Sequence, residues 1–175
     1  MRPATPITKE KALQKLQTLC GRAEQCEHDI TQKLYIWRLP AADRKEIIEF
    51  LKENRYIDDF RYAKSFAHDK ARFSGWGPNK INIELRKKRI PVPQIKEALS
   101  LIDNHIWKES LIKNASAKSR HLDLIGEEEY NNRQKLFRYL VSRGFPSSAS
   151  SKAVTLMASR QRKEAENNEL SGNEE

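Results

Sequence analysis

A spaced pattern of apolar residues that ends in proline occurs three times along the chain. One apolar residue is followed four positions later by a second and five positions after that by a third, directly before Pro. The three copies are Ile30, Leu34, Leu39, Pro40, then Ile81, Leu85, Ile90, Pro91, then Leu136, Leu140, Phe145, Pro146. Residues four apart share one face of a helix, and Pro cannot continue a helix. Each copy therefore predicts an amphipathic helix that stops just before the Pro, and the recurrence predicts a repeat protein.

Further apolar stripes at helical spacing flank each copy, and no run of strict apolar–polar alternation predicts a strand. The flanking stripes cover residues 13–20 and 47–51, 60–67 and 95–102, and 106–112 and 153–157. We therefore expect an all-α fold of three tandem three-helix repeats, stacked into an elongated molecule. The expected repeats span residues 9–54, 55–104 and 105–159. Residues 1–8 and the charged residues 160–175 are expected to be disordered tails.

Several single residues fit helix ends. Asp29 is a candidate cap for the helix that holds Ile30, and Asp58 or Asp59 for the first helix of the second repeat. Pro78 suits the first turn of the next helix, where its missing N–H costs nothing. Gly144 follows the second helix of the third repeat and is a candidate for the left-handed residue that often ends helices.

Composition favours a binding protein over a compact enzyme. Only 38% of the residues are hydrophobic and 33% are charged, and a thin helical stack tolerates this better than a sphere does. The formal net charge is +9, which suits nucleic acid, an acidic protein surface or an anionic membrane as partner. No apolar stretch is long enough to span a bilayer, and residues 1–8 do not resemble a secretory signal.

The two cysteines, Cys20 and Cys26, are expected to be free thiols in a reducing cytoplasm. A metal site made of Cys20, Cys26 and His28 lacks the second ligand pair that structural zinc sites use, so we expect no metal and no cofactor.

Several stretches resemble the RecX regulatory family. The most specific is Arg55-Tyr56-Ile57-Asp58-Asp59-Phe60-Arg61-Tyr62-Ala63, after which Arg72, Gly75, Gly77, Ile81 and Leu85 fall at family positions. Weaker matches are Leu19-Cys20-x-Arg22-Ala23-x-x-Cys26 with Lys33-Leu34, and Leu140-x-x-Arg143-Gly144-Phe145. Together they cover residues 9–157. The sequence departs from the family at Arg89, where Gly is usual before the apolar residue that ends the helix, and Arg38 stands at the equivalent place in the first repeat.

The resemblance implies a curved molecule of three tandem three-helix repeats. It implies a non-enzymatic modulator of the recombinase RecA, which binds in the groove of the RecA–DNA filament and restrains its ATPase and strand exchange. Implied partners are the RecA filament and single-stranded DNA, with double-stranded DNA a further candidate. We expect a cytoplasmic monomer acting in homologous recombination, DNA repair and the SOS response. The sequence leaves the sign of regulation open, with inhibition as the expected one.

Positive charge is concentrated in the second repeat. Residues 55–99 hold eleven basic and five acidic side chains, and the densest run is Arg86-Lys87-Lys88-Arg89 at a predicted helix end. Such a cluster suits an acidic partner, although cations also favour the negative end of a helix dipole. The residues expected to contact RecA or DNA are Arg61, Lys64, Arg72, Trp76, Lys80, Arg86, Lys87, Lys88 and Arg89. Trp76 serves equally well as a stacking aromatic or as part of a tight interhelical turn formed with Gly75 and Gly77.

Two other functions compete with this interpretation. A helix-turn-helix protein that binds DNA independently of RecA would read bases from the start of a recognition helix, where Asn79, Lys80 and Asn82 are the candidates. An enzyme acting on nucleic acid would need a carboxylate cluster or a nucleophile–base pair. Asp58 and Asp59 are paired carboxylates, but no further catalytic group accompanies them, so we assign them and Gly75, Gly77 and Gly144 structural roles.

Overall fold

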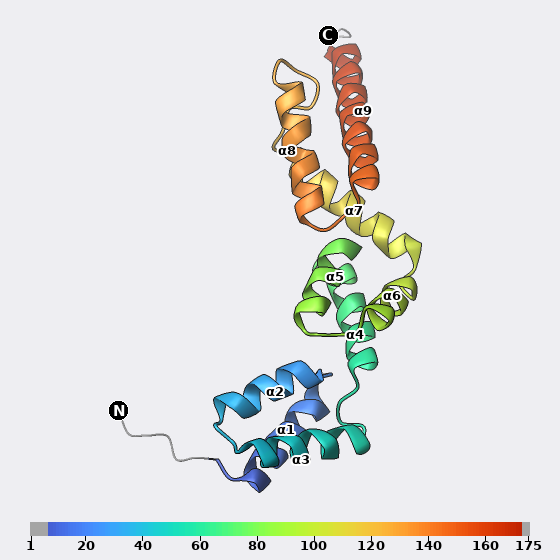
Figure 1. Ribbon diagram of the computed structural model, residues 1–175. Helices are drawn as coiled ribbons and strands as arrows, with labels where there is room; N and C mark the ends of the chain where they lie inside the picture. Colours follow the sequence, from blue (N-terminus) through green and yellow to red (C-terminus); the bar gives the residue numbers. More distant parts are fainter. Residues whose placement is uncertain (1–6, 173–175) are drawn as a thin grey trace, which may run out of the picture. The chain divides into compact units, whose positions relative to one another are not determined.

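The computed structural model describes residues 7–172, and every regular element in this range is a helix. The helices are α1 (Lys9–Arg22), α2 (Glu27–Ile36), α3 (Ala41–Glu53), α4 (Asp59–Arg72), α5 (Pro78–Lys87), α6 (Val92–Ser100), α7 (Asn104–Ser119), α8 (Glu129–Ser142) and α9 (Ser147–Gly172) (Figure 1). The predicted all-α fold of tandem three-helix repeats is confirmed. No helix of the described range is long and apolar enough to cross a membrane.

Contacts along the chain group the residues into two compact units. Unit 1 holds α1–α3, the first half of α4 as far as Phe66, and residues 84–101. Unit 2 holds residues 67–83 and everything from Ile102 onward. The second of the three repeats is therefore shared between the units, since α4 and α5 each begin in one and end in the other.

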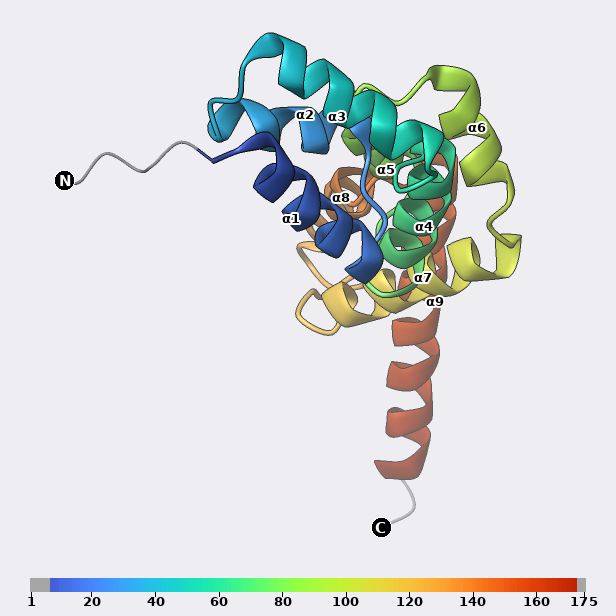
Figure 2. The ribbon, with the colours of Figure 1, turned by 90° about the horizontal axis from the view of Figure 1, so that it is seen from below.

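The core of unit 1 is built by the apolar stripes that the sequence displays. Ile30 and Leu34 of α2 are fully buried against Leu16 of α1 and the Ile47 and Leu51 positions of α3. Helices α1 and α2 both contact α3, and the three lie together in Figures 1 and 2. Each fully buried Leu or Ile contributes on the order of 2 kcal/mol relative to exposure, which is what holds these short helices together.

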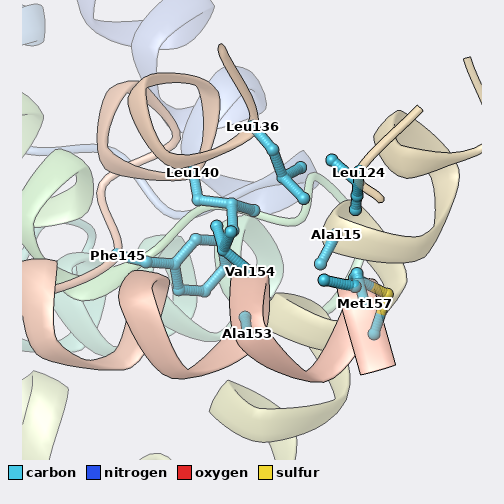
Figure 3. Close-up of a cluster of buried hydrophobic side chains, with 9 residues drawn as sticks. Ala115, Leu124, Leu136, Leu140, Phe145, Ala153, Val154 and Met157 are labelled. Atoms are coloured by element: carbon cyan, nitrogen blue, oxygen red, sulfur yellow. The ribbon is translucent and has the colours of Figure 1, made fainter. Parts of the chain in front are cut away.

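A second core lies in unit 2, among α7, α8 and α9. Leu136, Leu140 and Phe145, the third copy of the sequence pattern, point toward Val154 and Met157 of α9 (Figure 3). Ala115 of α7 and Leu124 of the α7–α8 loop complete the cluster. The residues of the repeated pattern are thus core residues in both units, as the spacing predicts.

Four helix ends use one capping geometry. A residue with positive φ follows the helix, and its N–H donates to the carbonyl three residues back, while the next N–H donates to the carbonyl five back. The left-handed residues are Arg38 (φ 57°), Arg55 (57°), Arg89 (61°) and Gly144 (94°). Gly144 therefore ends α8 as predicted. Arg38 and Arg89 stand where the family usually has Gly or at the equivalent position of the first repeat. Both adopt the left-handed conformation despite their Cβ atoms, so the helices end in the same way without Gly.

Two expectations about order and capping need correction. The stretch from residue 160, predicted to be disordered, continues α9 as helix to Gly172, while residues 1–6 and 173–175 of the predicted tails lie outside the described range. Asp29 does not cap α2, because that helix begins two residues earlier with Cys26 at its N-cap position. Pro78 begins α5 as predicted.

Candidate partner-binding site

The paired carboxylates of the second repeat are helix caps on two different helices. Asp58 Oδ1 accepts a hydrogen bond from the Arg61 N–H at 2.9 Å, which caps α4. Asp59 Oδ1 accepts one from the Glu27 N–H at 2.9 Å, at the first residue of α2. The cap that α2 lacks locally is therefore supplied from the start of the second repeat, 32 residues further along the chain.

Burial changes the titration of this junction. Asp59 is half-buried, and desolvation raises its pKa above the ordinary 3.8, although the hydrogen bond from Glu27 opposes the shift. Cys26 is fully buried beside it, and burial raises the pKa of that thiol to about 11. A protonated, inaccessible thiol is a poor metal ligand and nucleophile. Among the described residues no three His, Cys, Asp or Glu side chains gather where they could hold a metal ion.

Two of the predicted binding cations are engaged in ion pairs within unit 1. Arg61 Nε donates to Glu24 Oε1 at 2.6 Å, and its Nη2 donates to the carbonyl of Arg55 at 3.1 Å. Lys88 Nζ contacts both carboxylate oxygens of Asp29, at 2.7 and 2.8 Å. Both pairs join the first repeat to the second, so they act as internal ties whose charges are largely neutralised.

Four further predicted binding cations lie in unit 1. Lys64, Arg86, Lys87 and Arg89 are all exposed, and the last three lie within four residues at the end of α5. Lys87 Nζ makes a 2.7 Å ion pair with the half-buried Glu84, three residues earlier on the same helix, and such pairs within one helix are worth about 0.5 kcal/mol. The end of α5 therefore presents a cluster of three exposed cations, Arg86, Lys87 and Arg89.

The glycine motif of the second repeat forms a joint with the third repeat inside unit 2. The Gly77 N–H donates to the Arg143 carbonyl at 2.8 Å, and the Asn79 N–H donates to the Gly144 carbonyl at 3.0 Å. A Cβ at Gly77 would lie 2.5 Å from the Phe145 nitrogen and closer still to the Gly144 backbone. Gly77 is thus required by close backbone approach. Gly75 has a φ of 63°, and a Cβ there would also lie 2.7 Å from Asn114 Nδ2.

Side chains from α7 and α8 complete this joint. Asn114 Nδ2 donates to the Gly75 carbonyl at 3.1 Å, and Arg143 Nη2 donates to the carbonyls of Ser74 and Gly75. The Tyr139 hydroxyl donates to Asn114 Oδ1 at 3.2 Å. The roles of Asn114 and Tyr139 were not predicted, because nothing in the sequence marks which residues of the third repeat meet a loop about 40 residues earlier.

Two lysines lie close to the Trp76 ring of the same joint. Lys80 Nζ is 4.5 Å from the centre of the indole ring and Lys70 Nζ is 5.2 Å from it. Two cations on a half-buried indole are held by cation–π attraction and form a positively charged spot. Of the predicted binding residues, the structure thus brings Trp76 and Lys80 together in unit 2, and Arg72 is exposed at the end of α4 in the same unit.

The fold and this arrangement define a class: an all-α protein of tandem three-helix repeats, tied together by caps, ion pairs and a glycine joint, with cations at exposed helix ends. Comparisons with known proteins give the family. Residues 58–99 match the model of the second three-helix domain of RecX.

The curated relatives that match carry the name regulatory protein RecX. The chain is 30% identical over 141 residues to that of Vibrio parahaemolyticus serotype O3:K6, covering 81% of this chain and 85% of the relative. It is 34% identical over 119 residues to that of Clostridium botulinum strain Eklund 17B, covering 68% of this chain and 55% of the relative. The chain thus spans about half the length of several Clostridium relatives.

Solved structures agree. A crystal structure of regulatory protein RecX aligns with a TM-score of 0.71 at 27% identity, covering 81% of this chain and 68% of that one. The crystal structure of RecX from Lactobacillus salivarius, at 20% identity, also has a TM-score of 0.71 and covers 85% of this chain and 96% of that one, and it shows the shared fold. The chain belongs to the RecX family of regulatory proteins.

Proposed function

We propose that this chain binds the RecA–DNA filament and restrains its ATPase and strand exchange. Family membership supports a regulatory role, and the observation that carries the choice of site is the exposed cationic cluster Arg86, Lys87 and Arg89 at the end of α5. Three cations beside one another suit a partner with a regular row of negative charges, such as a phosphate backbone. Lys64, Arg72 and Lys80 are further candidate contacts, together with Trp76.

Arg61 and Lys88 have a supporting part in this proposal. Their ion pairs with Glu24 and Asp29 position the start of α4 and the end of α5 in unit 1. Reversing either charge would leave a partly buried carboxylate without its partner, so a binding test should leave both residues unchanged.

The test measures ATP hydrolysis by RecA on single-stranded DNA with increasing amounts of this protein. We expect hydrolysis to fall with the wild type and to remain high with the triple variant Arg86→Glu, Lys87→Glu, Arg89→Glu. The matched control reverses three other exposed cations, Lys135→Glu, Arg138→Glu and Arg160→Glu, and should inhibit as the wild type does. Unchanged hydrolysis at stoichiometric wild-type protein would contradict the proposed function, whereas inhibition by the triple variant would place the site elsewhere.

The packing of α5 weighs against the alternative of a helix-turn-helix reader. Such a reader places the first residues of its recognition helix against base edges in the major groove. Here the Asn79 backbone is bonded to Gly144, and Lys80 packs beside the same glycine through its Cβ. The start of α5 is therefore covered by the α8–α9 turn of unit 2, although the Asn79 side chain is exposed.

A further inference from the structure

A cleft of about 620 Å³ lies in unit 2, between the end of α4 with its following loop and the outer face of α7. This volume is within the range of about 300–1,000 Å³ in which proteins hold small ligands and peptide side chains. One wall carries Ala71, Arg72 and Phe73, and the other carries Ile106, Ser110 and Lys113. None of these residues is needed by the capping, ion-pair and glycine contacts described above.

Phe73 is the apolar feature of the cleft. Its side chain is 76% exposed, the highest value of any large hydrophobic residue that the structure describes. His68 meets the ring edge-on at 6.5 Å, and the Arg72 guanidinium carbon lies 5.9 Å from its centre. An exposed aromatic ring offers a partner a large contact area and has only two side-chain torsions to order.

The charged residues that line the cleft favour a ligand with negative charge. Arg72 and Lys113 are exposed cations at its rim, while the one acidic residue lining it, Glu109, lies 3.7 Å from His105 Nδ1. The lining thus combines an excess of positive charge with the apolar Phe73 and Ile106. A peptide that carries both carboxylates and a bulky apolar side chain complements both features, whereas a phosphate backbone complements the cations alone. By contrast, the cleft of about 600 Å³ in unit 1, beside α2 and α3, is lined by three acidic and three basic side chains and shows no preference.

We propose that this cleft docks a short extended segment of a partner protein in which a bulky apolar side chain is flanked by carboxylates. The apolar side chain packs on Phe73 and Ile106, and the carboxylates pair with Arg72 and Lys113. The proposal goes beyond filament binding, and it is measured without RecA, so either can fail while the other holds.

The experiment pans a phage-displayed library of random 12-residue peptides on the purified protein of 175 residues. We expect enrichment of peptides with one bulky apolar residue between acidic residues, and their synthetic versions are then titrated by fluorescence anisotropy. Phe73→Ala and Lys113→Glu should each weaken binding about tenfold or more, the effect of losing a hot-spot contact.

Matched controls separate the cleft from general effects. Tyr130→Ala removes an aromatic ring that is 73% exposed outside the cleft, and Lys108→Glu reverses an exposed charge on α7 that does not line it. Both should bind within about twofold of the wild type, and all variants should keep the wild-type thermal unfolding midpoint.

Three results would overturn the proposal. One is a selection without enrichment, or with enrichment of basic peptides. Another is binding that survives both Phe73→Ala and Lys113→Glu in folded protein. The third is displacement of the peptide by oligothymidylate whose own affinity falls in the same two variants, which would make the cleft a nucleic-acid site.

Discussion

Single residues in this protein carry backbone conformations that their side chains do not favour. Arg38, Arg55 and Arg89 have φ values of 57°, 57° and 61°, each just after a helix. Positive φ raises the conformational energy of any residue that has a Cβ, because the Cβ crowds the carbonyl oxygen. The hydrogen bonds of the cap and the buried apolar residue that follows Arg38 and Arg89 offset that cost.

Replacing Arg89 by Gly should therefore stabilise the protein. Relative to Arg89→Ala, which removes the same charge but keeps the Cβ, Arg89→Gly should raise the free energy of unfolding by about 1 kcal/mol. Urea denaturation followed by circular dichroism measures the difference. Equal stability of the two variants would show that the left-handed conformation costs nothing at this position.

At the scale of elements, the start of α2 shows how a helix end can depend on a distant residue. No local side chain caps α2, and Asp59 accepts the Glu27 N–H instead. The carboxylate is half-buried, so desolvation disfavours its charged form, while its oxygen stabilises the helix end by accepting the Glu27 N–H. The two effects can be separated, because Asn presents the same oxygen without the charge.

The Asp59 junction gives a pH prediction. A raised pKa means that folded protein binds the proton more readily, so the contribution of Asp59 to stability is full below pH 3.8 and is lost as pH rises through the higher folded pKa. Asp59→Asn does not titrate, so its stability relative to the wild type should increase as pH rises from 3.8 toward 7.

Urea denaturation of the wild type and Asp59→Asn at several pH values measures this difference, and other carboxylates cancel in the comparison. Asp59→Ala loses the cap itself and should be about 1 kcal/mol less stable than Asp59→Asn at every pH, because neither side chain titrates. A difference between Asp59→Asn and the wild type that does not change with pH would show that burial does not govern this carboxylate.

At the scale of the whole molecule, three repeats in sequence become two compact units in space. The third repeat holds the middle of the chain through backbone contact, because Gly77 and Gly144 lie too close for a side chain on either. The ties between the first and second repeats are instead side-chain caps and ion pairs. The backbone contact between Gly77 and Gly144 leaves no room for an added side-chain atom. The side-chain caps and ion pairs between the first and second repeats should tolerate substitutions that keep the charge or the hydrogen-bonding group.

Gly77→Ala should consequently destabilise unit 2. Its Cβ would collide with the Gly144 backbone, and the shift needed to avoid this should cost about 1–3 kcal/mol. Hydrogen exchange read by mass spectrometry should show faster exchange in residues 67–83, with residues 9–53 unchanged.

The control is Gly21→Ala, at a helical position where a Cβ meets nothing within 4 Å. It should raise stability by about 0.5–1 kcal/mol because Ala favours helix over Gly. If Gly77→Ala were as well tolerated as Gly21→Ala, the backbone joint between the second and third repeats would be wrong.

The sequence by itself determined the helices, the core and the family. Local chemistry decides these: the spacing of Ile81 and Leu85 fixes one buried helix face, Pro78 begins a helix, and the Asp58-Asp59 motif identifies the family. Sequence reasoning failed for the polar segment after residue 160, which was expected to be disordered but continues α9. The free energies of helix and coil differ little for such a segment, so its local sequence does not decide between them.

Tertiary structure alone decided which charged residues are used internally. Arg61 and Arg89 look alike in the sequence, yet Arg61 is half-buried and pairs with Glu24 while Arg89 is exposed, and Asp29 pairs with Lys88, 59 residues further on. The cleft at Phe73 likewise exists only because α7 packs beside the end of α4. Contacts between residues far apart in the chain depend on how helices pack, and helical periodicity gives the buried face of each helix but not its neighbour.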